Sequence, residues 1–158
     1  MRSSSAIMVV LALGLAACGP PMAPPVTVAP APIKAGFNQT WNSVVDILSE
    51  KNIPVKTLDK SSGYVMAEIT GVSVGSEKGF ADCGHTTMAS LLLGGGEIGT
   101  VIARYNILVR GDSAASQVKV TATFVMDNKG HQTTCSSLGT FESQFQGDVK
   151  ARAETTIR

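Results

Sequence analysis

Two neighbouring segments that alternate between apolar and polar side chains place the strongest limit on what this chain can fold into. Residues 100–110 and 117–126 carry apolar side chains at every second position, and largely polar side chains stand between them. This period of two predicts β-strands with one buried face and one solvated face. Gly111, Asp112 and Ser113 form a turn between the segments, so we expect an antiparallel hairpin.

The flanking sequence predicts a second hairpin and two helices. Residues 53–58 and 64–70 resemble short strands joined by a turn. Apolar residues spaced about 3.6 apart predict a helix over residues 38–51, with Asn38 as its N-cap, and another over about residues 138–155. The first helix carries its stripe on Trp41, Val44, Val45 and Leu48, and the second on Leu138, Phe141, Phe145 and Val149.

The order of these elements is helix, hairpin, irregular insert, hairpin and helix. This order predicts an α+β fold in which an antiparallel sheet of about four strands is covered on one face by an N-terminal and a C-terminal helix. Residues 36–158 are long enough for one compact domain and too short for two.

The N-terminus reads as an export signal. Arg2 precedes an apolar run over residues 6–15, which is shorter than the roughly 20 residues that a transmembrane helix needs. Leu15-Ala16-Ala17-Cys18 resembles the lipobox of bacterial lipoproteins. The resemblance implies that residues 1–17 are removed and that Cys18 is acylated, with more than one chain needed for stable anchoring. An ordinary signal peptide with a chance cysteine is the alternative.

Residues 18–35 are predicted to be a tether. Six of the seven prolines lie here: Pro20, Pro21, Pro24, Pro25, Pro30 and Pro32. Such a stretch favours extended polyproline II over regular secondary structure, and at ~3.1 Å per residue it could hold a domain up to roughly 50 Å from the lipid. Gly19 after the cysteine implies sorting to the outer membrane, by similarity to lipoproteins of enteric bacteria.

The segment over residues 37–70 resembles the repeated domain of BamC-like outer-membrane lipoproteins. The shared pattern is Trp41-x-x-Val44-Val45-x-x-Leu48, followed by Ile53, Asp59 and Gly63. The resemblance implies a helix-grip architecture and an accessory role in the envelope through protein contacts. It covers about a quarter of the chain, and the chain departs from the family in having one such domain and two extra cysteines.

Cys83 and Cys135 remain once Cys18 is assigned to the lipid. An even number of cysteines in an oxidising compartment predicts a disulfide. The bond would close a loop of about 52 residues and contribute roughly 4 kcal/mol in the loop-entropy model. The alternative is a metal or redox site in which Cys83, His85, His131 and Cys135 supply the ligands of a structural zinc. Their spacing differs from that of zinc fingers, so we expect no metal.

Residues 94–99 match the G-x-G-x-x-G pattern of dinucleotide-binding loops. The residues that follow alternate as a strand, whereas a nucleotide site needs a helix there. We therefore expect no nucleotide and no cofactor. The apolar stretch from Met88 to Leu93 is either core or an exposed patch for a partner.

The charge pattern argues against nucleic acid. Arg2 is one of 13 Lys and Arg residues and lies in the signal, so the mature chain carries as many basic as acidic residues, and the basic ones are scattered. Only two histidines occur, both in expected loops, and Asp82 near His85 is the one local acid–base pair. We therefore expect no enzyme and no catalytic residues.

These observations favour a lipid-anchored envelope protein that acts as a binding or assembly module, facing the periplasm from the outer membrane. Its partners would be the membrane, through Cys18, and an envelope protein, which it would contact through the solvated sheet face or the insert. A small metal-binding or redox lipoprotein is the second hypothesis, and a surface-exposed adhesin is the third.

Overall fold

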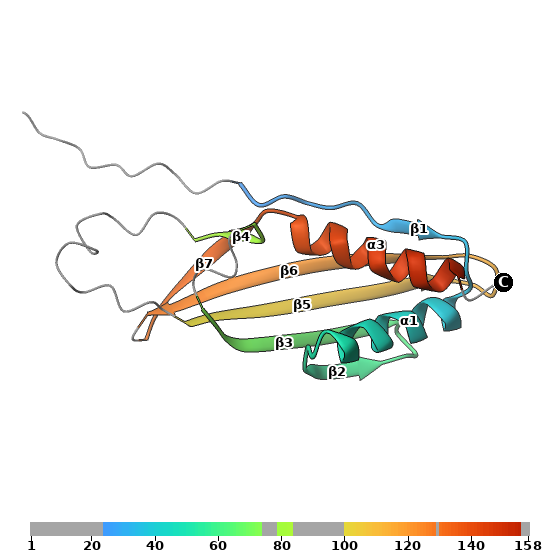
Figure 1. The fold of residues 1–158 in the computed structure, drawn as a ribbon, viewed down its shortest axis with the longest axis horizontal. Helices are drawn as coiled ribbons and strands as arrows, with labels where there is room; N and C mark the ends of the chain where they lie inside the picture. Colours follow the sequence, from blue (N-terminus) through green and yellow to red (C-terminus); the bar gives the residue numbers. More distant parts are fainter. Residues whose placement is uncertain (1–23, 74–78, 84–99, 129, 156–158) are drawn as a thin grey trace, which may run out of the picture.

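The computed structural model describes residues 24–73, 79–83, 100–128 and 130–155 of the chain (Figure 1). Several expectations lie outside these residues: the signal peptide, the lipid attachment at Cys18, the glycine-rich segment, and the alternatives for His85 and for Met88 to Leu93. The described residues fold as α+β, with a seven-stranded antiparallel sheet and two helices.

The chain runs through its elements in a simple order. The strands are β1 (Ala31–Ile33), β2 (Val55–Asp59), β3 (Tyr64–Ser73), β4 (Ala81–Asp82), β5 (Thr100–Gly111), β6 (Ser116–Asn128) and β7 (His131–Ser137). The helices are α1 (Phe37–Glu50) and α3 (Thr140–Thr155). The sheet order is β2-β3-β5-β6-β7-β4, and β1 pairs with β6 off this path.

The expected count of four strands was wrong, because β1, β4 and β7 also join the sheet. The β4 strand is two residues long, and β7 reads HQTTCSS, which has no apolar alternation. β1 falls in the stretch where we expected no regular secondary structure. These strands form because a neighbouring strand offers a partner, which a local pattern does not reveal.

The core lies between the sheet and the helices, which both cover the same face (Figure 1). The predicted alternation along β5 and β6 is confirmed: Val101, Ala103, Tyr105, Ile107, Val109, Val118, Val120, Ala122 and Phe124 are all buried. The α1 helix adds Trp41, Val44, Ile47 and Leu48 to this core, and α3 adds Phe145, Val149 and Ala153. The core therefore uses one face of the sheet.

The start of α1 differs from the expectation. Gly36, in an extended conformation, occupies the N-cap position, and no side chain caps the helix. Asn38 is exposed and is the second residue of the helix. The Phe37 N–H donates instead to the Asp112 carbonyl at 2.7 Å, so the turn between β5 and β6 satisfies the helix end.

The two helices also contact each other. Lys51, the C-cap residue of α1, pairs with Asp148 of α3 at 3.0 Å, and Arg152 of α3 pairs with Glu50 of α1 at 2.6 Å. The Gln39 side chain donates to the Ala153 carbonyl at 2.8 Å. Exposed ion pairs of this kind contribute little each, so we attribute the helix pairing mainly to the shared core.

Candidate functional site

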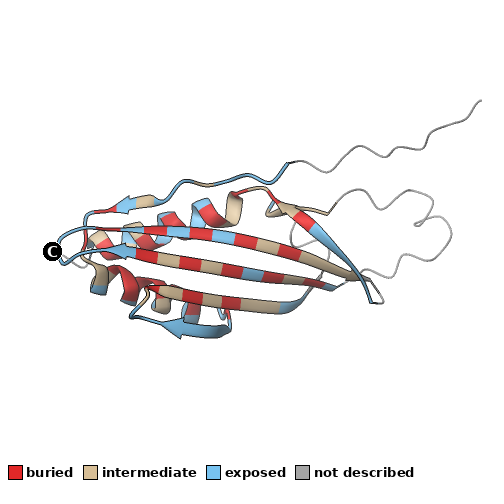
Figure 2. Ribbon diagram, turned by 180° about the vertical axis from the view of Figure 1, so that it is seen from behind, coloured by how far each residue is buried: buried red, intermediate tan, exposed pale blue. Residues whose placement is uncertain are grey.

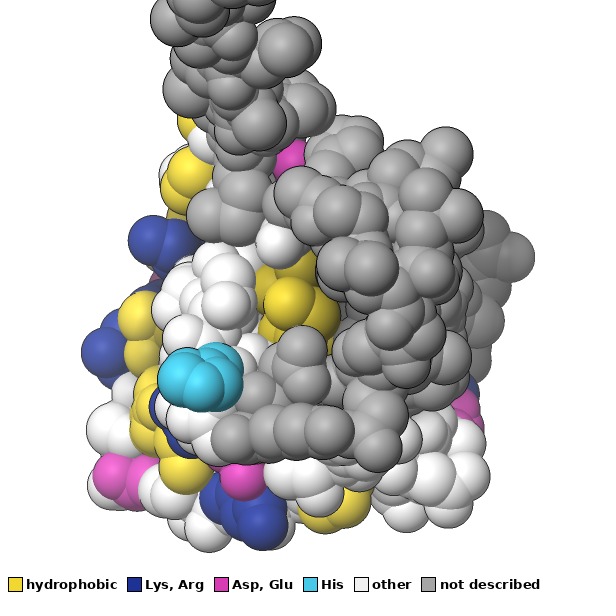
Figure 3. Space-filling view, turned by 90° about the vertical axis from the view of Figure 1, so that its left-hand side faces the viewer, with side chains coloured by type: hydrophobic (Ala, Val, Ile, Leu, Met, Phe, Trp, Pro, Cys, Tyr) yellow, Lys and Arg dark blue, Asp and Glu magenta, His cyan; other side chains and the backbone are white. Residues whose placement is uncertain are grey.

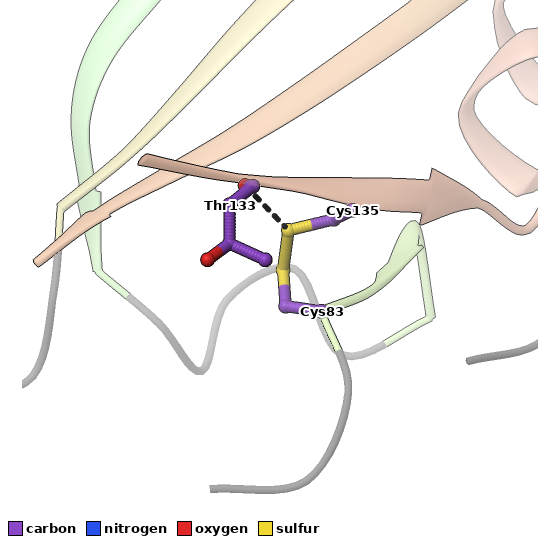
Figure 4. The surroundings of a disulfide bond; sticks show 3 residues. All are labelled: Cys83, Thr133 and Cys135. Carbon is purple, nitrogen blue, oxygen red and sulfur yellow. Dashed lines mark hydrogen bonds between the residues drawn. A yellow bond between two sulfur atoms is a disulfide. The ribbon is translucent and has the colours of Figure 1, made fainter. Parts of the chain in front are cut away.

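Cys83 and Cys135 are joined in a disulfide, with their Cα atoms 4.1 Å apart (Figure 4). Antiparallel pairing of β4 with β7 places Ala81 opposite Ser137 and carries Cys83 to the side of Cys135. The Thr133 carbonyl lies 3.9 Å from the Cys135 sulfur. A disulfide sulfur carries no hydrogen, so we treat this as a packing contact.

His131 is the first residue of β7 and is exposed, so the expectation that it stands in a loop was wrong. In a strand, residues four apart are roughly 13 Å from each other. His131 and Cys135 therefore cannot bind one metal ion together as they could from a helix. In the part of the chain that the structure describes, no three His, Cys, Asp or Glu residues are grouped to hold a metal.

Sequence reasoning missed one catalytic pattern. Residues 71–75 read Gly-Val-Ser-Val-Gly and match G-x-S-x-G, the nucleophile elbow of α/β-hydrolases. That elbow places its serine on a sharp turn between a strand and a helix. Ser73 instead ends β3 and is paired with Thr100 of β5. The next described residues, 79–83, form a turn and β4.

The sheet face opposite the helices carries a mixed set of side chains, which we call the open face. Its members come from the alternate positions of β3, β5 and β6: Tyr64, Met66, Glu68, Ile102, Arg104, Asn106, Leu108, Lys119, Thr121, Thr123 and Val125. Figure 2 shows this face from the side away from the helices, and no described element lies over it. The prediction of one uncovered face is confirmed for these strands.

Polar contacts fix several side chains of the open face. Arg104 donates two hydrogen bonds to the Glu68 carboxylate, at 2.8 and 3.1 Å. The Tyr64 hydroxyl donates to the Asn106 side chain at 2.7 Å. These cross-strand pairs hold long side chains in one conformation, which reduces the entropy that a binding partner would have to remove.

The edge of β6 that faces away from β5 is only partly paired with other strands. β1 pairs with its residues 116–118 and β7 with its residues 124–128. Between them, residues 119–123 have no strand partner on that side within the described ranges. An open strand edge presents main-chain N–H and C=O groups, so this gap needs other hydrogen-bond partners.

Two buried side chains of α3 supply hydrogen-bond partners for this unpaired edge of β6. The Ala122 N–H donates to Glu142 Oε1 at 3.2 Å. The Gln146 amide, in the orientation that satisfies both of its neighbours, accepts from the Val120 N–H at 3.2 Å and donates to the Ala29 carbonyl at 3.0 Å. Glu142 and Gln146 are 3% and 4% exposed. The helix therefore closes the gap with side chains where a strand would use its main chain.

Glu142 also ties the end of β7 to α3. The Ser137 hydroxyl donates to Glu142 Oε1 at 2.7 Å and accepts from the Gly139 N–H at 3.2 Å. Glu142 stands in the first turn of α3, where the helix dipole favours a negative charge. Its other oxygen, Oε2, is buried and has no hydrogen-bond partner in the described part of the chain.

A cavity of about 560 Å³ adjoins this carboxylate. Its walls are residues 25–28, residues 119–123 of β6 and residues 134–137 of β7. Sequence reasoning did not single out Glu142 or Gln146, although their spacing of four beside the apolar stripe of α3 marks polar residues on a buried face.

Among the described helices, none has the length and apolar character needed to cross a membrane. No protein-family model matches this chain, and no curated protein matches it either. The resemblance to BamC-like lipoproteins therefore stays a prediction, as does the lipobox.

Proposed function

We propose that this chain is a lipid-anchored envelope protein that works as a non-catalytic binding or assembly module. The open face is the contact surface for a protein partner, and acylated Cys18 holds the domain on the periplasmic side of the outer membrane. The observation that carries the proposal is the open face itself. The lipobox pattern and the Cys83–Cys135 disulfide, typical of exported proteins, support the compartment.

The composition of the open face suits a protein partner. The apolar side chain of Met66 stands between the hydrogen-bonded Glu68–Arg104 and Tyr64–Asn106 pairs, and that of Leu108 lies opposite Tyr64. Tyr, Met and Arg are enriched at the centres of protein interfaces. A partner that buries the apolar residues meets polar groups already held in place, so less side-chain entropy is lost on binding.

The anchor is tested by the intact mass of the mature protein isolated from membranes, before and after reduction and alkylation. We expect an acylated Cys18 and no free thiol until reduction. An unmodified Cys18 would remove the anchor from the proposal. Two free thiols without reduction would instead favour the metal or redox alternative.

The contact surface is tested by affinity capture from detergent-solubilised membranes. Leu108→Glu places a charge on β5, the middle of the three strands that form the open face, and Gln144→Glu places one on the exposed side of α3 as a matched control. We expect both the wild type and the control to retain one specific partner that Leu108→Glu loses. Equal recovery by all three proteins would refute the role of the open face, provided that the variants have the same far-ultraviolet circular dichroism.

A further inference from the structure

Residues 24–35 lie against the domain, although their composition predicts a free tether. Ile33 and Ala35 are 2% and 1% exposed. The Ser116 hydroxyl donates to the Ala35 carbonyl at 2.8 Å, and the Lys150 ammonium donates to the Pro32 carbonyl at 2.8 Å. This part of the chain is therefore built into the edge of the sheet.

The docking continues towards the N-terminus beyond β1. The Ala29 carbonyl accepts from Gln146, and the Val26 N–H donates to the Ser137 carbonyl at 2.9 Å. Gly139 has a positive φ of 76°, and a Cβ atom there would lie 2.8 Å from the Val26 side chain. Glycine thus allows the segment to approach the start of α3 closely.

The docked segment shortens the tether. Residue 24 is the sixth after Cys18, and a chain of that length reaches roughly 20 Å when fully extended. The free tether expected from sequence would reach roughly 50 Å. If Cys18 carries the lipid, the domain has much less freedom to move away from the membrane.

The docked segment also decides which end of the domain lies near the lipid. Followed from β1 towards the N-terminus, the chain passes along β6 and α3 to Ser137 (Figure 1). Ser137 lies at the end of β7 that pairs with β4. The turn at residues 112–115 lies at the opposite end of β6. Six residue steps along β6, from 116 to 122, separate that turn from the level of Ser137, which is about 20 Å.

The described surface at the β4–β7 end suits contact with a bilayer surface. Figure 3 looks onto this end and shows the exposed histidine next to uncharged polar and hydrophobic side chains, with Lys or Arg and Asp or Glu side chains nearby. His131, Gln132, Thr133 and Thr134 are all exposed there. The Asp127 carboxylate accepts from the Gly130 N–H at 2.9 Å, which offsets part of its charge. The uncharged part of this surface can approach an anionic headgroup layer without strong repulsion.

We infer that the β4–β7 end is the membrane-facing end of the domain and that docking of residues 24–35 holds it there. The inference rests on the proposed lipid anchor. It leaves the turn at residues 112–115 directed away from the lipid and the open face along the side of the domain, where a partner can reach both.

The test uses the acylated full-length mature protein in vesicles of phosphatidylethanolamine and phosphatidylglycerol that contain a headgroup quencher. A fluorescent amino acid replaces His131 in one sample and Ala114 in another, since the two positions mark opposite ends and both are exposed. We expect severalfold stronger quenching at position 131. Equal quenching, or stronger quenching at position 114, would overturn the inference.

A pair of substitutions tests whether docking sets the orientation. Val26→Pro removes the N–H that donates to Ser137, and Val28→Asp places a charge on a half-buried position beside Gly139. Together they should lengthen the free tether and remove most of the difference between the two labels. The matched control is Thr27→Pro, at an exposed residue. An unchanged difference in the double variant would show that docking does not orient the domain.

Failure of the inference is distinguishable from failure of the anchor. A protein without an acyl group on Cys18 floats free of the vesicles, and both proposals then fall. Equal quenching on a protein that stays bound overturns the orientation alone. Hydrogen exchange on the Cys18→Ser chain adds a measurement without lipid: we expect slow exchange over residues 31–35, and fast exchange across residues 24–35 would overturn the docking.

Discussion

Successive side chains of β5 and β6 point to opposite faces of the sheet, and the two faces have different environments. On β6, Phe124 is 1% exposed beneath the helices, whereas its neighbour Thr123 lies on the open face and is half-buried. The helix-covered face holds the large buried side chains, and the open face mixes apolar and charged ones. This difference indicates that the stability of the fold depends on the covered face, so the side chains of the open face are available for function.

The largest expected effect is on the covered face. Phe124→Ala should lower the free energy of unfolding by about 3–5 kcal/mol, because it removes a fully buried ring and leaves a cavity. Urea denaturation of the oxidised protein measures the change. Thr123→Ala, one residue away on the open face, is the control and should alter the stability by less than about 0.5 kcal/mol. Similar losses in both variants would contradict the contrast between the faces.

Loss of the disulfide should have a comparable or slightly smaller effect. Cys83→Ser with Cys135→Ser opens a loop of 52 residues, and the loop-entropy model predicts a loss of roughly 4 kcal/mol. Reduction of the wild type should lower its thermal midpoint to about that of the double variant. The double variant should not respond to the reductant. A double variant as stable as the oxidised wild type would show that β4 needs no covalent link.

Glu142 is a polar residue of α3 that is buried against the covered face of the sheet. Glu142→Ala should cost about 1–3 kcal/mol, since the buried Ala122 N–H and the Ser137 hydroxyl lose their acceptor. Glu142→Gln keeps an acceptor at that position and should cost less. Chemical denaturation ranks the two variants, and equal costs would mean that the negative charge, which both variants lack, matters more than the acceptor.

The smallest effect is expected in the exposed turn between β2 and β3. The Ser61 hydroxyl donates to the Asp59 carboxylate at 2.6 Å, and with Ser62 it lowers the pKa of Asp59 to about 2. The unfolded pKa is about 3.9. The stabilisation from Asp59 is therefore complete above the unfolded pKa and is lost as pH falls through the folded value.

This loss should appear as a small acid-side decrease in stability between about pH 4 and pH 2, which Asp59→Asn removes. The carboxylate is exposed, so the change will be small beside that of Phe124→Ala. Stability measured by urea denaturation at several pH values tests it. An identical acid-side slope in the wild type and Asp59→Asn would show that the turn does not contribute.

Sequence reasoning identified the elements that carry their own pattern. The alternation of residues 100–110 and 117–126 predicted β5 and β6, and the apolar stripes through Trp41 and Phe145 predicted α1 and α3. In each, burial on one side of a regular element repeats along the chain, so the period appears in the residues themselves. The α+β class followed from the order of those elements.

The tertiary structure alone decided the features that depend on distant partners. β1 lies in a proline-rich stretch, and β7 has no alternation, yet both pair with β6 because its edge lies open beside them. The sequence does not show what Glu142 and Gln146 bind, because the main-chain groups of their hydrogen bonds lie in the distant residues 119–123 of β6. Hydrogen bonds between segments far apart in sequence leave no local period, so only the assembled fold shows that the expected tether is part of the domain.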